Sequence, residues 1–304
     1  MKKLLLIATA AILAVLFACS PKKDVNQEMQ SKLDAFVEVE LKTDISHLSE
    51  KEKQMLPYLF EAAQIIDDIF WSQAYGDKKE LLSKIKDDAS IAFAKLNYGP
   101  WERLKDNKPF IDGFGKKPLG ANFYPTDMTR EEFDAFESDN KTSLYTVIRR
   151  NADGTLVSIP YNEAYKEQYD KLVELIRNAA ELAEDEGLKN YLNLRAEALL
   201  SGEYLASDMA WMDMKTNNID FVVGPIENYE DMLFNYKAAH EAFILIKDVE
   251  WSQRLSHFAA LLPKLQESLP VAKEYKTETP GSDSDLGCHI LCGRLQRRKQ
   301  NYCY

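Results

Sequence analysis

The sequence predicts a mostly α-helical fold with a small β component, an α+β protein. Two observations lead to this class. Long stretches repeat apolar residues at helical spacing, and a few short segments carry the β-branched pattern of strands. The 304 residues suffice for one large domain or two ordinary ones, and the 45% of hydrophobic residues supply a core. No internal repeat is evident, so a solenoid is not expected.

Composition and charge exclude several classes of protein. The 38 basic and 49 acidic residues give a formal net charge of −11. A net anion repels a polyanion, so no nucleic-acid partner is expected. With 12 Gly, 11 Pro and 4 Cys, the chain is also not a collagen-like, low-complexity or disulfide-scaffold protein.

The first half of the chain shows helical patterns. Residues 31–46 are interpreted as a weak first helix or a lead-in. Ser49 and Glu52 form a capping box before a long apolar-periodic run, which Pro57 either starts or kinks. A second helix is expected over 78–97.

A segment rich in Gly, Pro and aromatic residues follows at 98–128. We interpret it as an ordered loop pinned by its aromatic side chains. It does not fit a phosphate-binding loop, because Ala121 follows Gly120 where that motif needs Lys.

The second half mixes helices and strands. A turn sequence between β-branched flanks predicts a hairpin at 145–159, and apolar runs predict strands at 219–223 and 242–246. Helical spacing and capping residues predict further helices at 129–138, 162–184, 188–201, 205–214 and 249–268.

The first 19 residues resemble a bacterial lipoprotein signal. Two lysines precede an apolar segment too short to span a bilayer, and Ala18 provides a small residue before Cys19. The resemblance implies a signal peptide at 1–18, a lipid anchor on Cys19 and a polar tether over 19–34. The protein would then be exported and anchored to a membrane on the periplasmic or outer-membrane side. A plain secretory signal is the alternative.

The last residues differ in amino-acid composition from the rest of the chain. Residues 287–304 contain no acidic residue and three of the four cysteines. Three interpretations stay open: a basic interaction tail, a reading-frame error, or a zinc cluster, although the spacing lacks the paired C-x-x-C pattern. The cluster would consist of Cys288, His289, Cys292 and Cys303.

The body holds few residues of the kinds that catalysis uses. Before residue 287 it contains no cysteine besides Cys19, and its histidines are His47, His240 and His257. The pair His240-Glu241 is half of a zinc-peptidase motif, but no second ligand follows one helical turn later. We therefore interpret it as a surface or strand-edge histidine beside a glutamate. From the residues alone, the chain shows no complete active site.

The segment 219–231 passes from a β-rich run through Gly224 into Glu227 and Tyr229. It resembles the substrate-cleft segment of dipeptidyl peptidase III, a family of zinc exopeptidases, and the aromatic loop looks like that of the bacterial members. The resemblance covers about 35–286, which we expect to form the helix-rich N-terminal portion of the two-lobed fold of that family.

Several site residues are implied by this resemblance. Asp220 matches an acidic position that helps to hold the free amino terminus of a peptide, and Gly224, Glu227 and Tyr229 match the substrate-binding pattern. Structural roles remain open for all four. Val222 stands where eukaryotic members have a Tyr, so that contact to the substrate is not carried over.

The zinc motifs of the family, His-Glu followed by three residues and His, and a Glu-Glu helix, do not occur in the sequence. No catalytic or metal residue is therefore expected in this chain, and zinc belongs to the intact family. Residues 287–304 can be back-translated with permitted codons and then translated again one nucleotide later. One of the resulting sequences resembles the next segment of the bacterial enzymes. We thus expect a frameshift near residue 287 and an out-of-frame, disordered tail.

The sequence predicts the N-terminal part of a zinc-dependent dipeptidyl peptidase III. It would contribute substrate-binding residues for oligopeptides but would itself be inactive. The alternative is a non-enzymatic, surface-tethered lipoprotein that binds peptides. A third hypothesis is an unstable fragment with an exposed apolar face.

Overall fold

The computed structural model describes residues 25–276 and 288–293. The predicted signal peptide and the lipid anchor at Cys19 lie outside the described residues. Among the described helices, none combines the length and the apolar character needed to cross a bilayer.

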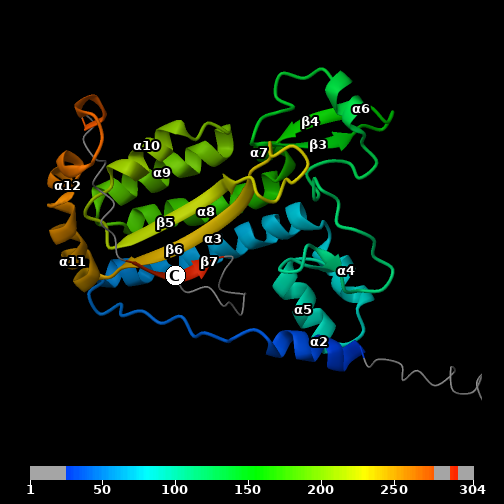
Figure 1. Cartoon of the computed structure of the whole chain (residues 1–304), viewed down its shortest axis with the longest axis horizontal. Helices are drawn as coiled ribbons and strands as arrows, with labels where there is room; N and C mark the ends of the chain where they lie inside the picture. Colours follow the sequence, from blue (N-terminus) through cyan, green and yellow to red (C-terminus); the bar gives the residue numbers. More distant parts are fainter. Residues whose placement is uncertain (1–24, 277–287, 294–304) are drawn as a thin grey trace, which may run out of the picture.

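At the centre of the molecule, one long helix packs against both an antiparallel sheet and a layer of helices (Figure 1). The strands are β5 (Ile219–Glu227), β6 (Ala239–Lys247) and β7 (Cys288–Gly293), in the spatial order β5-β6-β7. The main helices of the centre are α3 (Glu50–Ala74), α8 (Lys166–Leu182), α9 (Glu186–Ser201) and α10 (Leu205–Asp213). The α+β class predicted from the sequence is confirmed.

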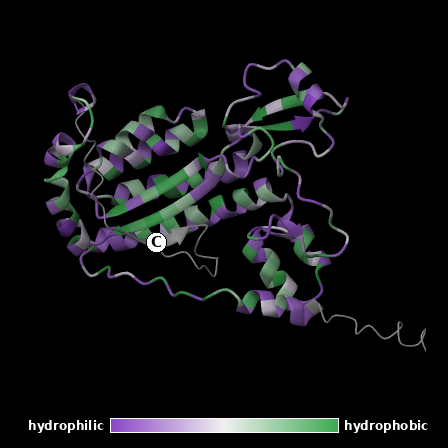
Figure 2. Cartoon of the chain, in the orientation of Figure 1, coloured by the Kyte–Doolittle hydropathy of each residue, from purple (hydrophilic) through white to green (hydrophobic). Residues whose placement is uncertain are grey.

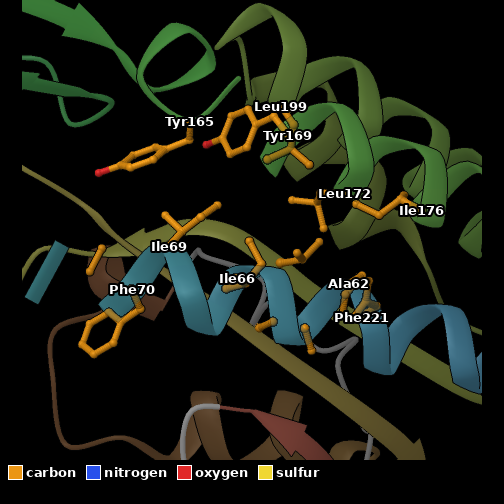
Figure 3. Close-up of a cluster of buried hydrophobic side chains, with 14 of the residues drawn as sticks. Ala62, Ile66, Ile69, Phe70, Tyr165, Tyr169, Leu172, Ile176, Leu199 and Phe221 are labelled. Atoms are coloured by element: carbon orange, nitrogen blue, oxygen red, sulfur yellow. The ribbon is translucent and has the colours of Figure 1, made fainter. Parts of the chain in front are cut away.

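Helix α3 starts at the predicted capping box: the Ser49 side chain accepts from the Glu52 backbone, and the Glu52 side chain accepts in return. The helix continues through Pro57, which removes only one backbone donor. Its apolar face packs against α8 and the sheet (Figure 3). Ile66 and Ile69 on α3, Leu172 on α8 and Phe221 on β5 are all at most 2% exposed.

His240 lies at the meeting point of this core and is fully buried on β6. Gln73 on α3 accepts from the His240 backbone N–H at 2.9 Å with its Oε1, so its Nε2 is the donor to His240 Nδ1 at 2.8 Å. The ring proton therefore sits on Nε2, which lies 2.5 Å from the hydroxyl oxygen of Tyr169 on α8. The interpretation of His240 as a surface residue is wrong, because β6 is covered by helices.

The N-terminal region differs from the sequence prediction. The helix expected at 31–46 is instead α2 (Val25–Asp34), and residues 37–45 form no regular element. Met29 and Leu33 of α2 are buried against Phe93 and Leu96. Residues 25–34, part of the expected tether, are thus helical and packed against the body.

Two long helices expected from periodicity are each broken into two. The segment 78–97 forms α4 (Lys78–Lys84) and α5 (Asp88–Asn97), because the Asp87 side chain caps the backbone N–H of Ser90. The segment 249–268 forms α11 (Val249–Ala259) and α12 (Leu262–Ser268). Pro263 lies in the first turn of α12, where its ring would clash with a helical carbonyl four residues earlier.

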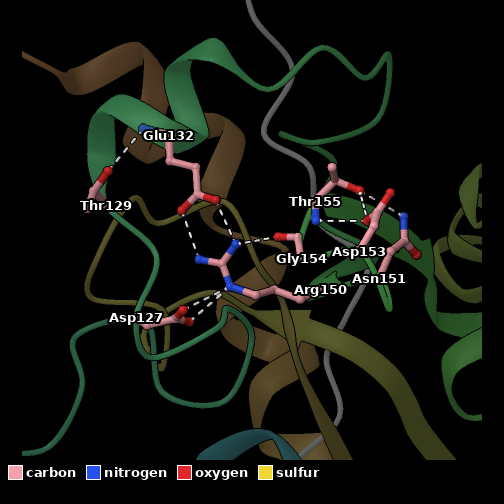
Figure 4. A network of polar contacts seen from close by, with 8 residues as sticks. All are labelled: Asp127, Thr129, Glu132, Arg150, Asn151, Asp153, Gly154 and Thr155. Carbon is pink, nitrogen blue, oxygen red and sulfur yellow. Dashed lines mark hydrogen bonds and ion pairs between the residues drawn. The ribbon is translucent and has the colours of Figure 1, made fainter.

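The hairpin predicted at 145–159 is present as β3 (Thr146–Arg150) and β4 (Leu156–Pro160). Arg150 ties it to α6 (Arg130–Ala135) through ion pairs with Asp127 and Glu132 (Figure 4). The aromatic loop is ordered as predicted, since Phe123 and Tyr124 are buried. The short elements are β1 (Trp101–Glu102), β2 (Lys108–Pro109), α7 (Tyr161–Ala164) and a 3-10 helix (Lys273–Lys276).

Strand β7 lies in the segment expected to be a disordered tail. It pairs with β6 in antiparallel register, from Lys247↔Cys288 to Phe243↔Gly293. The expectation of disorder is therefore wrong for residues 288–293. Residue 287, residues 294–304 and with them Cys303 of the hypothetical zinc cluster lie outside the described residues.

The buried imidazole predicts a pH dependence of stability. Burial lowers the pKa of His240 to about 3 from its ordinary value of 6.5. The unfolded chain gains a proton below pH 6.5 while the folded chain does not, so the contribution of His240 to stability is lost as pH falls from 6.5 towards 3. We expect the wild type to lose up to about 1.4 kcal/mol of unfolding free energy per pH unit in this window relative to His240→Gln.

Urea unfolding at half-unit pH steps measures this slope. Replacement of the exposed His257 by Gln is the matched control and should leave the slope of the wild type unchanged. Equal slopes for wild type and His240→Gln would contradict the assigned role of the buried ring.

Candidate functional site

The register of β5 and β6 brings the predicted site residues to one face of the sheet. Asp220 pairs with Leu245 and Glu227 pairs with Ala239, with a bulge between Pro225 and Glu227. Leu245 and Ala239 are six residues apart, an even number, and directly paired side chains share a face. Asp220 and Glu227 therefore lie on the same face, together with Gly224. Without the bulge their odd separation would place them on opposite faces.

Asp220 is a buried carboxylate with few donors. It is 8% exposed, and the indole N–H of Trp211 on α10 donates to its two oxygens at 3.0 and 3.1 Å. Burial raises the pKa of the Asp220 carboxyl, and the Trp211 hydrogen bond only partly opposes this. Among the described residues, no Lys or Arg forms an ion pair with it. A carboxylate in this setting is suited to bind a cation.

Gly224 lies further along β5, beside α9. Its φ of 126° is strained for any residue with a side chain. A Cβ at this position would lie 3.7 Å from Nη1 of Arg195 and 3.7 Å from Cε1 of Tyr204. Arg195 in turn donates to Asp208 at 2.6 Å. Gly224 thus allows a turned backbone next to a buried guanidinium, which supports a structural role.

Glu227 and Tyr229 lie beyond the bulge at the open end of β5. Both are exposed, Tyr229 by 78%, and neither side chain forms a hydrogen bond or ion pair with another described residue. The structure therefore places Asp220 and Gly224 against α9 and α10, and leaves the other two matched residues free on the surface.

Two carboxylates directly after Tyr229 fix the position of this segment. Glu230 is buried and accepts from both Nη atoms of Arg103 at 2.7 and 2.6 Å, and it is paired with the half-buried Lys117. Asp231 is fully buried and accepts from the Tyr124 hydroxyl at 2.7 Å. It also accepts from four backbone N–H groups, those of Leu233, Phe234, Tyr236 and Lys237.

Sequence reasoning missed Trp211, Arg195 and Glu230 as parts of this site. Trp211 and Arg195 lie on helices whose periodicity indicates only packing. Glu230 directly follows Tyr229 in the matched segment, but its cationic partners lie more than 100 residues away. No local pattern indicates such pairs.

The described residues do not fit a zinc ion. Both ring nitrogens of His240 form hydrogen bonds, one with Gln73 and one with Tyr169. Glu241, the next residue of β6, points to the face of the sheet opposite to that of His240. Within 25–276 and 288–293, no group of three or more His, Cys, Asp or Glu side chains is placed to hold a metal. No catalytic step is therefore derived through zinc on these residues.

Comparison with known proteins identifies the family of the chain. Residues 127–282 match the model of peptidase family M49. The structure is similar to that of DPP III from Caldithrix abyssi, with a TM-score of 0.79 and 41% identity over 87% of this chain and 52% of that chain. It is also similar to dipeptidyl-peptidase III from Corallococcus sp. strain EGB, with a TM-score of 0.73 and 35% identity over 82% of this chain and 49% of that chain.

The fold and the matched segment are those of dipeptidyl peptidase III structures. The chain belongs to peptidase family M49. The resemblance read from the sequence is thereby confirmed.

The chain spans about half the length of these relatives. A further match, Nudix hydrolase 3 from Arabidopsis thaliana, is 30% identical over 311 residues, which cover 82% of this chain and 40% of that protein. The activity in that name belongs to that protein and is not transferred here.

Because Glu230 is paired with two cationic side chains, its substitution should strongly lower the stability of the fold. Glu230→Ala leaves the half-buried Arg103 and Lys117 without this carboxylate, which costs up to about 3–5 kcal/mol. We expect a lower free energy of unfolding in urea and faster amide hydrogen exchange in residues 228–236. Glu131→Ala, an exposed carboxylate on α6, is the control. Unchanged exchange in the variant would show that Glu230 does not anchor the segment.

Proposed function

We propose that this chain is the peptide-binding half of a dipeptidyl peptidase III-type enzyme. It holds the free amino terminus of an oligopeptide at Asp220, while no group of side chains within 25–276 and 288–293 is placed to hold the zinc that hydrolysis uses in this family. The observation that carries the proposal is the buried Asp220 carboxylate, which has an indole donor and no cationic side chain among the described residues.

An ammonium group would pair with the buried negative charge of this carboxylate. A buried charge is costly unless it is paired, and the raised pKa of Asp220 reflects that cost. A protonated peptide amino terminus supplies one positive charge and three donors, which suits a buried carboxylate whose donors are the indole N–H of Trp211 and the backbone N–H of Phe221. Family membership supports peptides as the ligand class.

The remaining residues of the face extend the recognition surface. Val222 is half-buried between Asp220 and Gly224, and Glu227 and Tyr229 are exposed further along the strand. A peptide that runs along this face from Asp220 would meet them after several residues, at about 3.3 Å per residue.

A second candidate is a non-enzymatic lipoprotein that binds peptides, exported and anchored through Cys19. It rests on the same buried Asp220 and exposed Glu227 and Tyr229 as the first candidate. The two candidates differ in whether peptide capture is ever followed by release of a dipeptide.

The test is binding of an oligopeptide with a free amino terminus, compared with the same peptide after N-acetylation, by calorimetry. We expect the free peptide to bind at least about tenfold more tightly, because a charged hydrogen-bonded pair contributes about 1.5–3 kcal/mol. Asp220→Asn should remove this difference. Asp134→Asn, an exposed carboxylate on α6, is the control and should retain it.

The substitution Asp220→Asn should weaken peptide binding but stabilise the fold. The raised pKa of Asp220 means that its ionised form opposes folding above the unfolded pKa of 3.8. Asp220→Asn should therefore raise the free energy of unfolding at pH 7, and the gain should vanish at about pH 3. Loss of peptide preference together with lower stability at pH 7 would instead indicate that the variant damages the fold.

A further inference from the structure

A cavity of about 830 Å³ lies between three parts of the chain that do not belong to the proposed peptide-binding face. Its walls are α2, the connection from α4 into the first turn of α5, and the segment 102–114. Figure 1 shows α2, α4 and α5 grouped at the lower right, apart from the end of the sheet that leads into α11. A cavity of this size can enclose a small organic ligand.

The charge of the walls favours an anionic ligand. Five lysines and four carboxylates line the cavity, so its lining carries a small excess of positive charge. The whole chain has a net charge of −11. A positive cavity in an acidic protein attracts anions that the rest of the surface repels.

Three of the five lysines are already paired with carboxylates. The buried Glu102 forms ion pairs with Lys32 on α2 and with Lys105. Lys84 at the end of α4 pairs with Glu80 on the same helix, at 2.6 Å. These contacts fix the walls of the cavity and leave little charge on them for a ligand.

The other two lysines, Lys86 and Lys108, are exposed and form no ion pair with a described residue. Among the carboxylates of the lining, Asp87 caps α5 by accepting from the backbone N–H of Ser90 at 2.8 Å, and Asp112 is exposed. A dianion would neutralise both lysines, whereas a single carboxylate would neutralise one.

Ser90 adds a buried hydroxyl to this cavity. The residue lines the cavity and is 1% exposed, and its Oγ has no hydrogen-bond partner among the described residues. A buried hydroxyl without a partner is costly, and a ligand that accepts from it would remove that cost. Phosphate oxygens are strong acceptors of this kind.

The cavity also has an aromatic wall. Phe110 and Phe114 line it and are half-buried. Phe110 packs edge-on against Phe93, with ring centroids 4.7 Å apart, and Phe114 packs against Trp101 at 6.4 Å. Figure 2 shows both hydrophobic and hydrophilic residues on α2, α4 and α5. The lining therefore suits a ligand with an aromatic body as well as a charged group.

We propose that this cavity binds a small phosphate monoester with an aromatic organic group. The phosphate contacts Lys86, Lys108 and the Ser90 hydroxyl, and the aromatic group packs against Phe110 and Phe114. Recognition by lysines and a hydroxyl differs from that by a glycine-rich phosphate loop, which the sequence does not contain. The inference does not depend on the peptide site at Asp220.

The experiment is calorimetric titration of the full chain with phenyl phosphate, inorganic phosphate and benzoate. We expect phenyl phosphate to bind at least about tenfold more tightly than either of the other two probes. Inorganic phosphate lacks the ring, and benzoate carries one negative charge where a phosphate monoester carries about two.

Variants of the lining test the assigned contacts. The double variant Lys86→Gln, Lys108→Gln should weaken binding of phenyl phosphate at least about tenfold, and Ser90→Ala at least about threefold. The matched control is Lys79→Gln, Lys171→Gln, which removes two exposed lysines of α4 and α8 that do not line the cavity. It should bind as the wild type does. Circular dichroism checks that each variant is folded.

Four outcomes would overturn the inference. They are no binding of phenyl phosphate, equal binding of benzoate, equal binding of inorganic phosphate, and full binding by the Lys86, Lys108 double variant. A loss of binding in the control pair as large as in the double variant would also overturn it, because the attraction would then come from the overall charge of the chain.

Discussion

The hydrogen bonds of one neutral imidazole determine how the core is assembled. His240 on β6 is held by Gln73 on α3 and Tyr169 on α8, so three elements distant in sequence meet at one ring. A slip of β6 by one residue would carry His240 out of the core and leave the buried side chains of Gln73 and Tyr169 without this hydrogen-bond partner. The register of β6 is therefore fixed, and pairing with β6 fixes the register of β5. The position of Asp220 beside Trp211 follows from that register.

The segment from Asp220 to Asp231 contains carboxylates of three kinds, and their contacts separate their roles. Glu230 and Asp231 are buried with a full set of donors, so they stabilise the loop after β5. Glu227 is exposed and available to a ligand. Asp220 is buried, has a raised pKa and lacks a cationic partner among the described residues. A group whose burial opposes folding is explained by a ligand more readily than by packing. Asp220 and Glu227 both match the substrate-binding pattern of the family in sequence, but Asp220 is buried whereas Glu227 is exposed.

Local signals predicted much of the fold. The capping box at Ser49, the turn of the β3–β4 hairpin and the apolar strand runs are encoded by neighbouring residues, and each is present. Periodicity alone joined α4 to α5 and α11 to α12, although the Asp87 cap and Pro263 indicate the breaks. The burial of His240 was not predictable, because it depends on residues of two helices that are 71 and 167 positions away in the sequence. The bulge after Pro225, which brings Glu227 to the face of Asp220, also has no clear local signal. Resemblance supplied Asp220, but Trp211, which donates to it, came only from the structure.

Two features of this chain lack a partner within its described part, and they lie close together. Asp220 lacks a cation, and α11 and α12 expose apolar side chains that include Trp251 and Phe258. Each lowers the stability of the chain on its own, the first through desolvation of a charge and the second through exposed apolar area. A cationic ligand would offset the first cost, as proposed above, and burial of the apolar side chains would offset the second. Because β6, the partner strand of Asp220, leads directly into α11, both features lie at the same end of the sheet.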